Sequence, residues 1–492
     1  MRAAILVVLL GLVAATASAA AAPVADNFDR YFVDRTMRVD LVHVGNASEE
    51  LFTLDRVYEQ GIWAGSRTRL LDTIGTGNYL AKLYDAASGE LLFSRAWDSY
   101  FGEYRTTADA GKGVRRAYHE SVLTPFPRAK ARLVIERRQR DRSLKPIFET
   151  EVDPAAYTVI RGALTEGVIV VEALKGGDPH RCVDIAVIGE GYTAAEEGKF
   201  RKDLDRVVGI LFAQQPFARN KARFNVYGVL KPSQESGCSE PSRGIHRNTA
   251  VGASFDSLGS ERYMLTEENR ALHDIAAHVP YDALYIMVNH TRYGGGGIYN
   301  FFCTFTSDNQ WTPYVMVHEF GHAFAGLGDE YYTSSVAYNE FYPKGVEPTE
   351  ANLTALLDPA NLKWKDLVTP GTALPTPWEK ADYDAMDIAY QKVREELNGR
   401  IAKAMREGAP QAEVEKLKAE AEDLSLAHAR KIDAFLATSA FAAKVGAFEG
   451  GGYAATGIYR PALDCIMFTK GSKPFCAVCE RAIERVIDQY GE

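Results

Sequence analysis

Residues 317–331 read VHEFGHAFAGLGDEY, and the pattern HEFGH at 318–322 has a specific chemical meaning. Residues four positions apart lie on one face of a helix, so His318 and His322 can present both imidazoles to a single point. Paired imidazoles at this spacing are typical zinc ligands, and a glutamate beside the first is typical of the general base of a zinc hydrolase. We therefore predict a Zn²⁺ site with His318 and His322 as ligands and Glu319 as the catalytic residue.

A catalytic zinc site needs a third protein ligand besides the two histidines. Asp329 follows His322 by seven residues, and a continuing helix would carry it about 10 Å along the helix axis. Two glycines precede Asp329, and they can end the helix and turn the chain back towards the metal. Asp329 is thus the predicted third ligand, while Glu330 and Glu340 stay open as alternatives.

The stretch HEFGHAFAGLGDEYY resembles the core of the IgA-peptidase-type zinc metallopeptidases, a family of exported bacterial enzymes with a metzincin-like catalytic domain. Four further stretches look like other signatures of that family. The first resembles the strand that opens the catalytic domain and the rest its C-terminal signature: 183–193, 450–461, 464–467 and 475–479. The resemblance covers most of residues 160–492 and implies a methionine turn at Met467 beneath the metal.

The predicted fold is an α/β (α+β) metzincin-like zinc peptidase domain preceded by an all-β sandwich domain, with an inserted helical hairpin. Residues 26–155 hold short alternating runs such as 38–44, 79–84 and 132–136, separated by turn residues. Spacing of this kind favours a β-sandwich. Its aromatics (Trp63, Trp97, Tyr100 and Phe101) are expected in core and inter-domain packing, with a ligand-binding face as the alternative.

Residues 156–492 form the predicted catalytic domain, in which strands and helices alternate. Strands are expected at 183–188, 223–230 and 283–288, and Thr193 with Glu196 predicts a capping box for the helix that follows. Four glycines at 294–297 suit either an edge strand that receives an extended peptide or a flexible loop.

Residues 381–437 depart from the family pattern, because they are rich in Ala, Glu, Lys and Arg. Apolar positions form two stripes of helical period on either side of a Gly-Ala-Pro break at 408–410, which predicts an antiparallel helical hairpin. The stripes comprise Tyr390, Val393, Leu397 and Ile401, and Val414, Leu417, Ala421 and Leu424. The hairpin is expected to gate the cleft, to bind a partner or to be a solvated insertion.

Residues 1–19 have the pattern of a secretory signal peptide: Arg2, an apolar run and a small-residue cleavage site at Ala17-Ser18-Ala19. We therefore expect a secreted or periplasmic protein, and no later stretch is long and apolar enough for a transmembrane segment. The net charge of −9 offers no basic surface for nucleic acid. The sequence does not decide the oligomeric state.

The six cysteines are expected to form disulfides, because export leads to an oxidising compartment. Cys476 and Cys479 form a C-x-x-C pair with Cys465 nearby, so a structural zinc is the alternative, although the sequence does not reveal its fourth ligand.

These observations predict a zinc metalloendopeptidase that acts on a protein or peptide substrate. Glu319 would activate the attacking water and then protonate the leaving amine. The family name implies immunoglobulin A as substrate, but no stretch here reads as a selector for a hinge peptide. Tyr453 and Tyr459 are possible oxyanion stabilisers left outside the predicted catalytic set. Two alternatives stay open: a zinc hydrolase of a non-peptide amide, and a non-catalytic surface-binding protein with a structural zinc.

Overall fold

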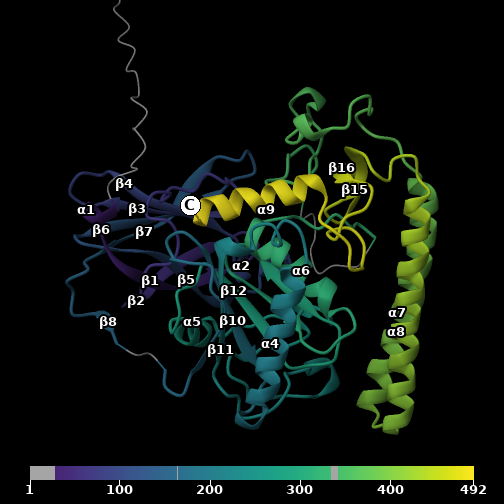
Figure 1. Ribbon diagram of the computed structural model, residues 1–492, viewed down its shortest axis with the longest axis horizontal. Coiled ribbons are helices and arrows are strands. Elements are labelled where there is room, and N and C mark those ends of the chain that lie inside the picture. Colours follow the sequence, from purple (N-terminus) through teal and green to yellow (C-terminus); the bar gives the residue numbers. More distant parts are fainter. Residues whose placement is uncertain (1–27, 163–164, 334–341, 492) are drawn as a thin grey trace, which may run out of the picture.

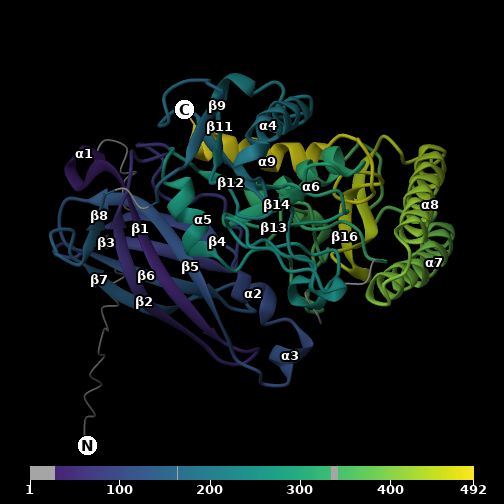
Figure 2. The same ribbon diagram turned by 90° about the horizontal axis from the view of Figure 1, so that it is seen from below.

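The computed structural model describes residues 28–162, 165–333 and 342–491 (Figure 1). The described chain has three parts side by side: a β-rich N-terminal part, a central mixed α/β part and a pair of long helices at the far edge (Figures 1 and 2). The predicted signal peptide (1–19) and the alternative ligand Glu340 lie outside the described residues. No helix among the described residues is long and apolar enough to cross a membrane.

The N-terminal part contains two four-stranded sheets, ordered β5-β1-β2-β8 and β4-β3-β6-β7. The expected strands at 38–44, 79–84 and 132–136 lie within β1, β3 and β6. The elements of this part are α1 (Phe28–Tyr31), β1 (Phe32–Gly45), β2 (Glu50–Glu59), β3 (Tyr79–Asp85), β4 (Leu91–Trp97), α2 (Tyr100–Tyr104), α3 (Ala108–Gly111), β5 (Arg116–Pro127), β6 (Ala131–Arg138), β7 (Leu144–Val152) and β8 (Val159–Arg161).

Apolar side chains from both sheets share one core; burial alternates along β3, whereas the middle of β1 is buried on both faces. The aromatics of this part are packed inside the protein. Trp63 and Trp97 lie in the core between the sheets, whereas Tyr100 and Phe101 pack against the central sheet of the next part. Packing is therefore their role, as expected, and they present no ligand-binding face.

A buried polar network ties the two sheets together around Glu50 on β2. Its carboxylate accepts hydrogen bonds from Tyr79 on β3 (2.6 Å) and from Arg137 on β6 (2.6 Å), and it pairs with His43 on β1 (3.1 Å) and Arg105 (2.9 Å). Burial by itself disfavours the charged carboxylate, but these partners outweigh it and lower the pKa of Glu50 to about 2.

The central part is built on a six-stranded sheet with the order β13-β14-β12-β10-β11-β9. Strands β10, β11, β12 and β14 are parallel, and the two edge strands run antiparallel to their neighbours. The elements are β9 (Ile169–Leu174), β10 (Val183–Glu190), α4 (Glu197–Leu211), β11 (Phe224–Leu230), α5 (Asn269–Ala276), β12 (Ala283–Val288), β13 (Gly295–Ile298), β14 (Phe302–Thr306) and α6 (Thr312–Ala325).

Both faces of this sheet are covered, which explains the continuous apolar run of β10. Val183, Ile185 and Val187 pack with α4 and α6 in one core, while Ala186 and Ile188 face α5 and the N-terminal aromatics. The strands expected at 183–188, 223–230 and 283–288 are confirmed, and so is the capping box of Thr193 and Glu196.

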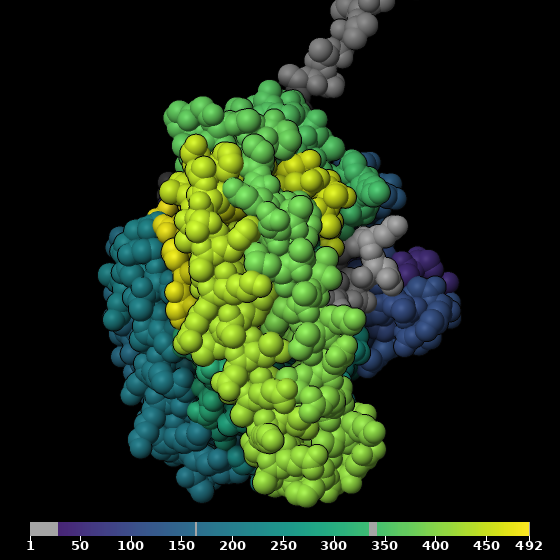
Figure 3. All heavy atoms as spheres, turned by 90° about the vertical axis from the view of Figure 1, so that its right-hand side faces the viewer, coloured from purple at the N-terminus to yellow at the C-terminus, as the bar shows by residue number. Residues whose placement is uncertain are grey.

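The C-terminal region contains α7 (Lys380–Arg406), α8 (Gln411–Ala437), β15 (Val445–Gly451), β16 (Ala454–Ala462) and α9 (Ala477–Tyr490). Helices α7 and α8 lie side by side and form the outer surface on their side of the molecule (Figure 3). Leu397, Ile401 and Leu417 are buried between them. Val393, on the same apolar stripe, is 48% exposed, because the helix pair is too thin to bury that stripe along its whole length.

The expected disulfides are wrong, because the structure holds all six cysteines as free thiols. A disulfide requires two sulfur atoms about 2.05 Å apart. Cys465 Sγ and Cys479 Sγ are separated by 3.9 Å, although both are buried side by side.

The Glu50 network predicts a specific loss of stability at acid pH. A carboxyl whose pKa is lowered on folding stabilises the fold above its unfolded pKa of about 4.5, and that contribution is lost as the pH falls towards 2. We expect Glu50→Gln to lower the free energy of unfolding by about 3 kcal/mol at pH 7. The difference from wild type should close between pH 4.5 and pH 2.

Urea unfolding of the full chain at pH 7 and at pH 3 measures this effect. Glu49→Gln is the matched control, because the Glu49 side chain is 57% exposed and pairs with Arg115 at the surface. An exposed pair of this kind is worth less than about 1 kcal/mol. Equal urea midpoints of unfolding for Glu50→Gln and Glu49→Gln at pH 7 would contradict the stabilising role of Glu50.

Candidate metal centre and active site

Helix α6 carries the HEFGH stretch and ends where the sequence predicts. Gly326 is the C-cap residue and has a left-handed backbone with φ of 58°, a conformation that glycine adopts without strain. The apolar face of α6 packs against β12, β14 and α4, so the helix is fixed in the core. His318 is buried and His322 half-buried on the face that looks out of this core.

The four-glycine stretch 294–297 lies against α6, and its strand β13 is the edge of the sheet. A Cβ atom at Gly297 would lie 2.4 Å from the Glu319 carbonyl oxygen and 3.0 Å from His322 Cβ. At Gly295 it would meet Val315 Cγ1 at 2.6 Å. The stretch is an edge strand and not a flexible loop, and the glycines are needed because the helix backbone approaches the strand so closely.

Three electron-pair donors converge at the end of α6. His318 Nε2 lies 3.1 Å from His322 Nε2, and Asp329 Oδ1 lies 3.0 Å from the former and 3.1 Å from the latter. Ligand atoms at about 2.0–2.1 Å from a tetrahedral ion are about 3.3 Å apart, so the three atoms have the spacing of one face of such a site. The turn at Gly326 brings Asp329 back to the histidines.

The hydrogen bonds of the histidines determine which nitrogen carries the proton. His318 Nδ1 donates to the Ile466 carbonyl at 3.0 Å, and His322 Nδ1 donates to the Leu327 carbonyl at 2.5 Å. A carbonyl oxygen only accepts, so each neutral imidazole has its lone pair on Nε2. Two lone pairs and a carboxylate oxygen facing one point repel each other unless a cation lies between them. The donor set therefore fits a divalent metal ion.

The charges of this group depend on each other. Burial disfavours a charged His322, but the Asp329 carboxylate outweighs burial and raises the pKa of His322 to about 9. Burial also opposes the charge of Asp329, yet the imidazoles hold its pKa well below the usual range. A proton and a divalent cation thus compete for the same position.

Glu319 is placed beside the three donors. One oxygen of its carboxylate lies within 4.8 Å of a ring nitrogen of each histidine. Burial in the cleft raises the pKa of Glu319, and the nearby histidines offset only part of this rise. A carboxylate whose proton affinity is increased in this way is suited to accept and release a proton.

Other contacts fix the loop that carries Asp329. Tyr453 Oη donates to Asp329 Oδ2, which leaves Oδ1 directed at the histidines. Asn352 forms hydrogen bonds with both the N–H (2.8 Å) and the carbonyl (2.9 Å) of Gly328. Tyr453 thus acts on the site through Asp329, a role that the sequence alone did not reveal; Tyr459 does not line the cleft.

The remaining sequence candidates take different positions. Glu330 is fully buried and points away from the histidine pair, with its Oε1 atom 3.4 Å from Cys479 Sγ. Met467 is also fully buried, beneath α6, where its sulfur would contact a Cβ atom at Gly321 at 3.0 Å. The position of Met467 agrees with the expected methionine turn, although the polar contact to His318 comes from the preceding residue, Ile466.

The cleft beside the three donor atoms holds a cavity of about 120 Å³, and the sequence alone did not reveal several of the residues that line it. Arg262, Tyr293, Tyr342 and Glu350 line it together with the motif residues. Arg262 comes from the loop before α5, and no local pattern distinguishes it from other surface arginines. Only the long-range fold brings its guanidinium over the Tyr331 ring, 5.8 Å from the ring centre.

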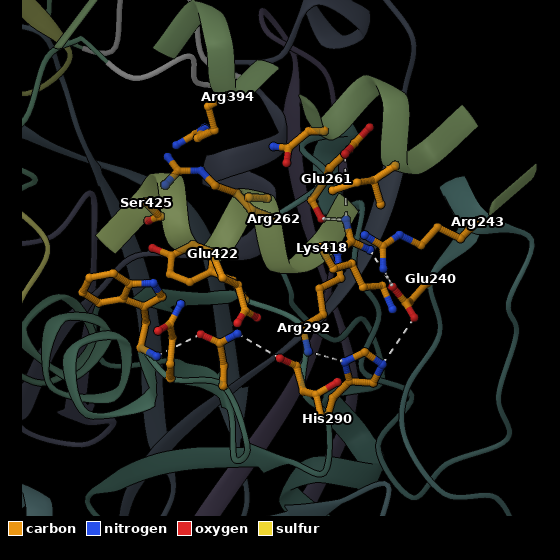
Figure 4. A pocket seen from close by; sticks show the side chains of 18 of the residues that line it. Glu240, Arg243, Glu261, Arg262, His290, Arg292, Arg394, Lys418, Glu422 and Ser425 are labelled. Atoms are coloured by element: carbon orange, nitrogen blue, oxygen red, sulfur yellow. Dashed lines mark hydrogen bonds and ion pairs between the residues drawn. The ribbon is translucent and has the colours of Figure 1, made fainter. Parts of the chain in front are cut away.

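A larger cavity of about 1430 Å³ adjoins the cleft and lies between the central part and the α7–α8 pair. Ser260, Arg262 and Tyr293 line both spaces. Figure 4 shows the charged walls of the larger cavity: Arg394, Lys418 and Glu422 come from the helix pair, and Glu240, Arg243 and Arg292 from the central part. The cleft thus opens beside a larger groove with charged side chains on its walls.

Comparisons with known families agree with this geometry. The family model described as IgA Peptidase M64 matches residues 171–487, and the model described as Peptidase M64 N-terminus matches residues 27–149. No curated protein matches the chain.

The contact between β13 and α6 gives a prediction about the site. We expect Gly297→Ala to displace the segment of α6 between Glu319 and His322, because the added Cβ atom would overlap the Glu319 carbonyl. The variant should lose metal and unfold at a lower temperature. Gly209→Ala, on α4, is the control, since a Cβ atom there has nothing within 4 Å. Metal content and thermal unfolding measure the effect, and a variant that keeps its full metal content would contradict this packing.

Proposed function

The chain belongs to the IgA peptidase M64 family, and from this premise we propose that it is an exported zinc-dependent endopeptidase. As a member of this family it is a peptidase, with proteins or peptides as substrates. The finer proposal assigns His318, His322 and Asp329 as zinc ligands and Glu319 as the general base. The observation that supports it best is the convergence of His318 Nε2, His322 Nε2 and Asp329 Oδ1 within 3.1 Å of one another.

The donor set suits zinc among the common metals. Two imidazoles and one carboxylate are a known set for catalytic zinc, with a fourth position open to water. When bound, zinc lowers the pKa of a coordinated water to about 7 and polarises the scissile carbonyl. Hydrogen bonds keep the ligands in place: the Ile466 and Leu327 carbonyls orient the imidazoles, and Tyr453 orients the carboxylate.

Glu319 performs the proton transfers of this proposal. Its carboxylate accepts the proton of the attacking water and then delivers it to the amine that leaves. The position of Glu319 beside both histidines supports this role.

The shape of the cleft favours a polypeptide substrate over a small amide. A small amide would be expected in a closed pocket, whereas this cleft opens beside the larger groove next to α7 and α8. Strand β13 is the last strand of the sheet; a short bridge from Tyr263 pairs with Gly295, and Gly297 lies beyond this bridge and lines the cleft. An extended peptide can add to such an edge through its backbone, with its side chains directed into the groove.

Export is proposed from the N-terminal pattern at residues 1–19, which has the charged start, the apolar run and the small-residue site of a signal peptide. We propose no preference for immunoglobulin A, because the features that support the proposal recognise peptide backbone and do not select a hinge sequence.

The test compares wild type with Glu319→Ala on unfolded casein and, separately, on immunoglobulin A. Both proteins should bind zinc, while the variant should cut casein about 10² to 10⁴ times more slowly, the usual contribution of a general base. Removal of zinc with a chelator should stop cleavage by wild type, and added zinc should restore it. The immunoglobulin arm separates broad from narrow specificity.

Glu197→Ala provides the control, because Glu197 is a surface carboxylate on α4 that pairs with Arg201. This variant should cleave casein at the wild-type rate. If Glu319→Ala retains zinc and cuts as fast as wild type, Glu319 is not the base. If zinc-loaded wild type cuts neither substrate, broad endopeptidase activity is wrong.

A further inference from the structure

A second group of metal-ligating side chains lies behind the active site. Glu330, Cys465, Cys476 and Cys479 each offer one ligand atom, and these four atoms lie within 4.8 Å of one another. Cys476 is the N-cap residue of α9 and Cys479 lies in its first turn, while Cys465 follows β16. Residues that are far apart in the chain thus meet at one buried point.

The distances in this group are those of a tetrahedral zinc site. Two sulfur ligands at about 2.3 Å from a zinc ion are about 3.8 Å apart, and a sulfur and a carboxylate oxygen are about 3.5 Å apart. The structure has 3.9 Å between Cys465 Sγ and Cys479 Sγ, and 3.4 Å between Cys479 Sγ and Glu330 Oε1. The sulfur atoms are too far apart for a disulfide.

The buried carboxylate of Glu330 supplies an independent argument. Its side chain is fully buried, and among the described residues its Oε2 atom has no hydrogen-bond partner. Oε1 accepts hydrogen bonds from Asn352 Nδ2 (2.9 Å) and from the Cys479 thiol (3.4 Å), and no ion pair to Glu330 is found in the described part of the chain. An isolated buried carboxylate costs several kcal/mol unless a cation or a proton neutralises it, and a bound cation would do so here.

The backbone also suits thiolates at this point. The Cys476 N–H donates to Cys465 Sγ at 3.3 Å, which stabilises negative charge on that sulfur. Cys476 and Cys479 lie at the N-terminus of α9, a fourteen-residue helix whose dipole also favours anionic ligands.

We propose that Glu330, Cys465, Cys476 and Cys479 bind a second, structural zinc ion. Four protein ligands leave no open position for water, so the site is closed and serves the fold. Three thiolates favour zinc over calcium or magnesium, which prefer oxygen ligands. Binding converts the three thiols to thiolates and releases their protons to solvent. The site does not depend on the proposed peptidase function.

The second ion would hold the framework of the first site. Glu330 adjoins Asp329 in the chain, and the Glu330 N–H donates to the Met467 carbonyl at 2.8 Å. Cys465 adjoins Ile466, whose carbonyl accepts the His318 Nδ1 proton. The closed zinc site would therefore fix the loop that carries Asp329. It would also fix the Ile466 carbonyl that orients His318, and it would anchor both segments to α9.

Metal content and cobalt spectroscopy of the full chain test this proposal. Purified wild type should contain two zinc ions per chain. Cys465→Ser and Glu330→Gln should lower zinc affinity at one site, whereas Cys303→Ser, a buried cysteine of β14 outside the group, should keep both ions. After exchange with Co²⁺, sulfur-to-cobalt charge-transfer absorption should appear in wild type, because only this second site contains sulfur.

The double variant His318→Ala/His322→Ala removes two ligands of the first site and leaves the cysteine group intact. It therefore tests the second site independently of the peptidase proposal, and without cysteine variants that could misfold. It should lose one ion and all cleavage, yet keep the full charge-transfer absorption. The proposal is overturned if wild type binds a single ion and lacks this absorption. It is also overturned if mass spectrometry of the unreduced protein finds a disulfide among Cys465, Cys476 and Cys479.

Discussion

The mutual repulsion of three electron-pair donors is the constraint on which the active site depends. His318 Nε2, His322 Nε2 and Asp329 Oδ1 lie about 3 Å apart, and the carbonyls bound to both Nδ1 atoms leave each neutral imidazole with its lone pair on the inward Nε2. The surrounding fold holds this arrangement. Helix α6 packs on glycine strand β13, the turn at Gly326 returns the chain, and Tyr453 and Asn352 fix the loop of Asp329.

The local part of this arrangement could be predicted from the sequence. A spacing of four on a helix is sufficient to place His318 and His322 on one face, and a glycine after the helix is sufficient to predict its end. The buried strands followed from apolar runs in the same way. The sequence did not decide between Asp329 and Glu330 as the third ligand, because both follow the turn. In the structure the Asp329 side chain lies against the histidines, and the Glu330 side chain lies against the cysteines.

The rest depends on contacts between distant segments, which a single sequence does not encode in a readable form. The sequence did not reveal a fourth member for the cysteine group, because this member is Glu330, which is 135 positions before Cys465 in the chain. Arg262 reaches the cleft from a loop without a recognisable motif. Val393 had helical periodicity but is exposed, since two thin helices bury only part of each stripe.

The most direct test of the central claim is the position of zinc in crystals of the full chain, located by anomalous scattering on either side of the zinc absorption edge. The account predicts a peak at about 2.0–2.2 Å from His318 Nε2, His322 Nε2 and an Asp329 oxygen, with the Glu319 carboxylate close by but not bound to the ion. A zinc-loaded crystal without this peak would contradict the account. So would an ion held by Glu319 with Asp329 turned away, because no base would then remain beside the water.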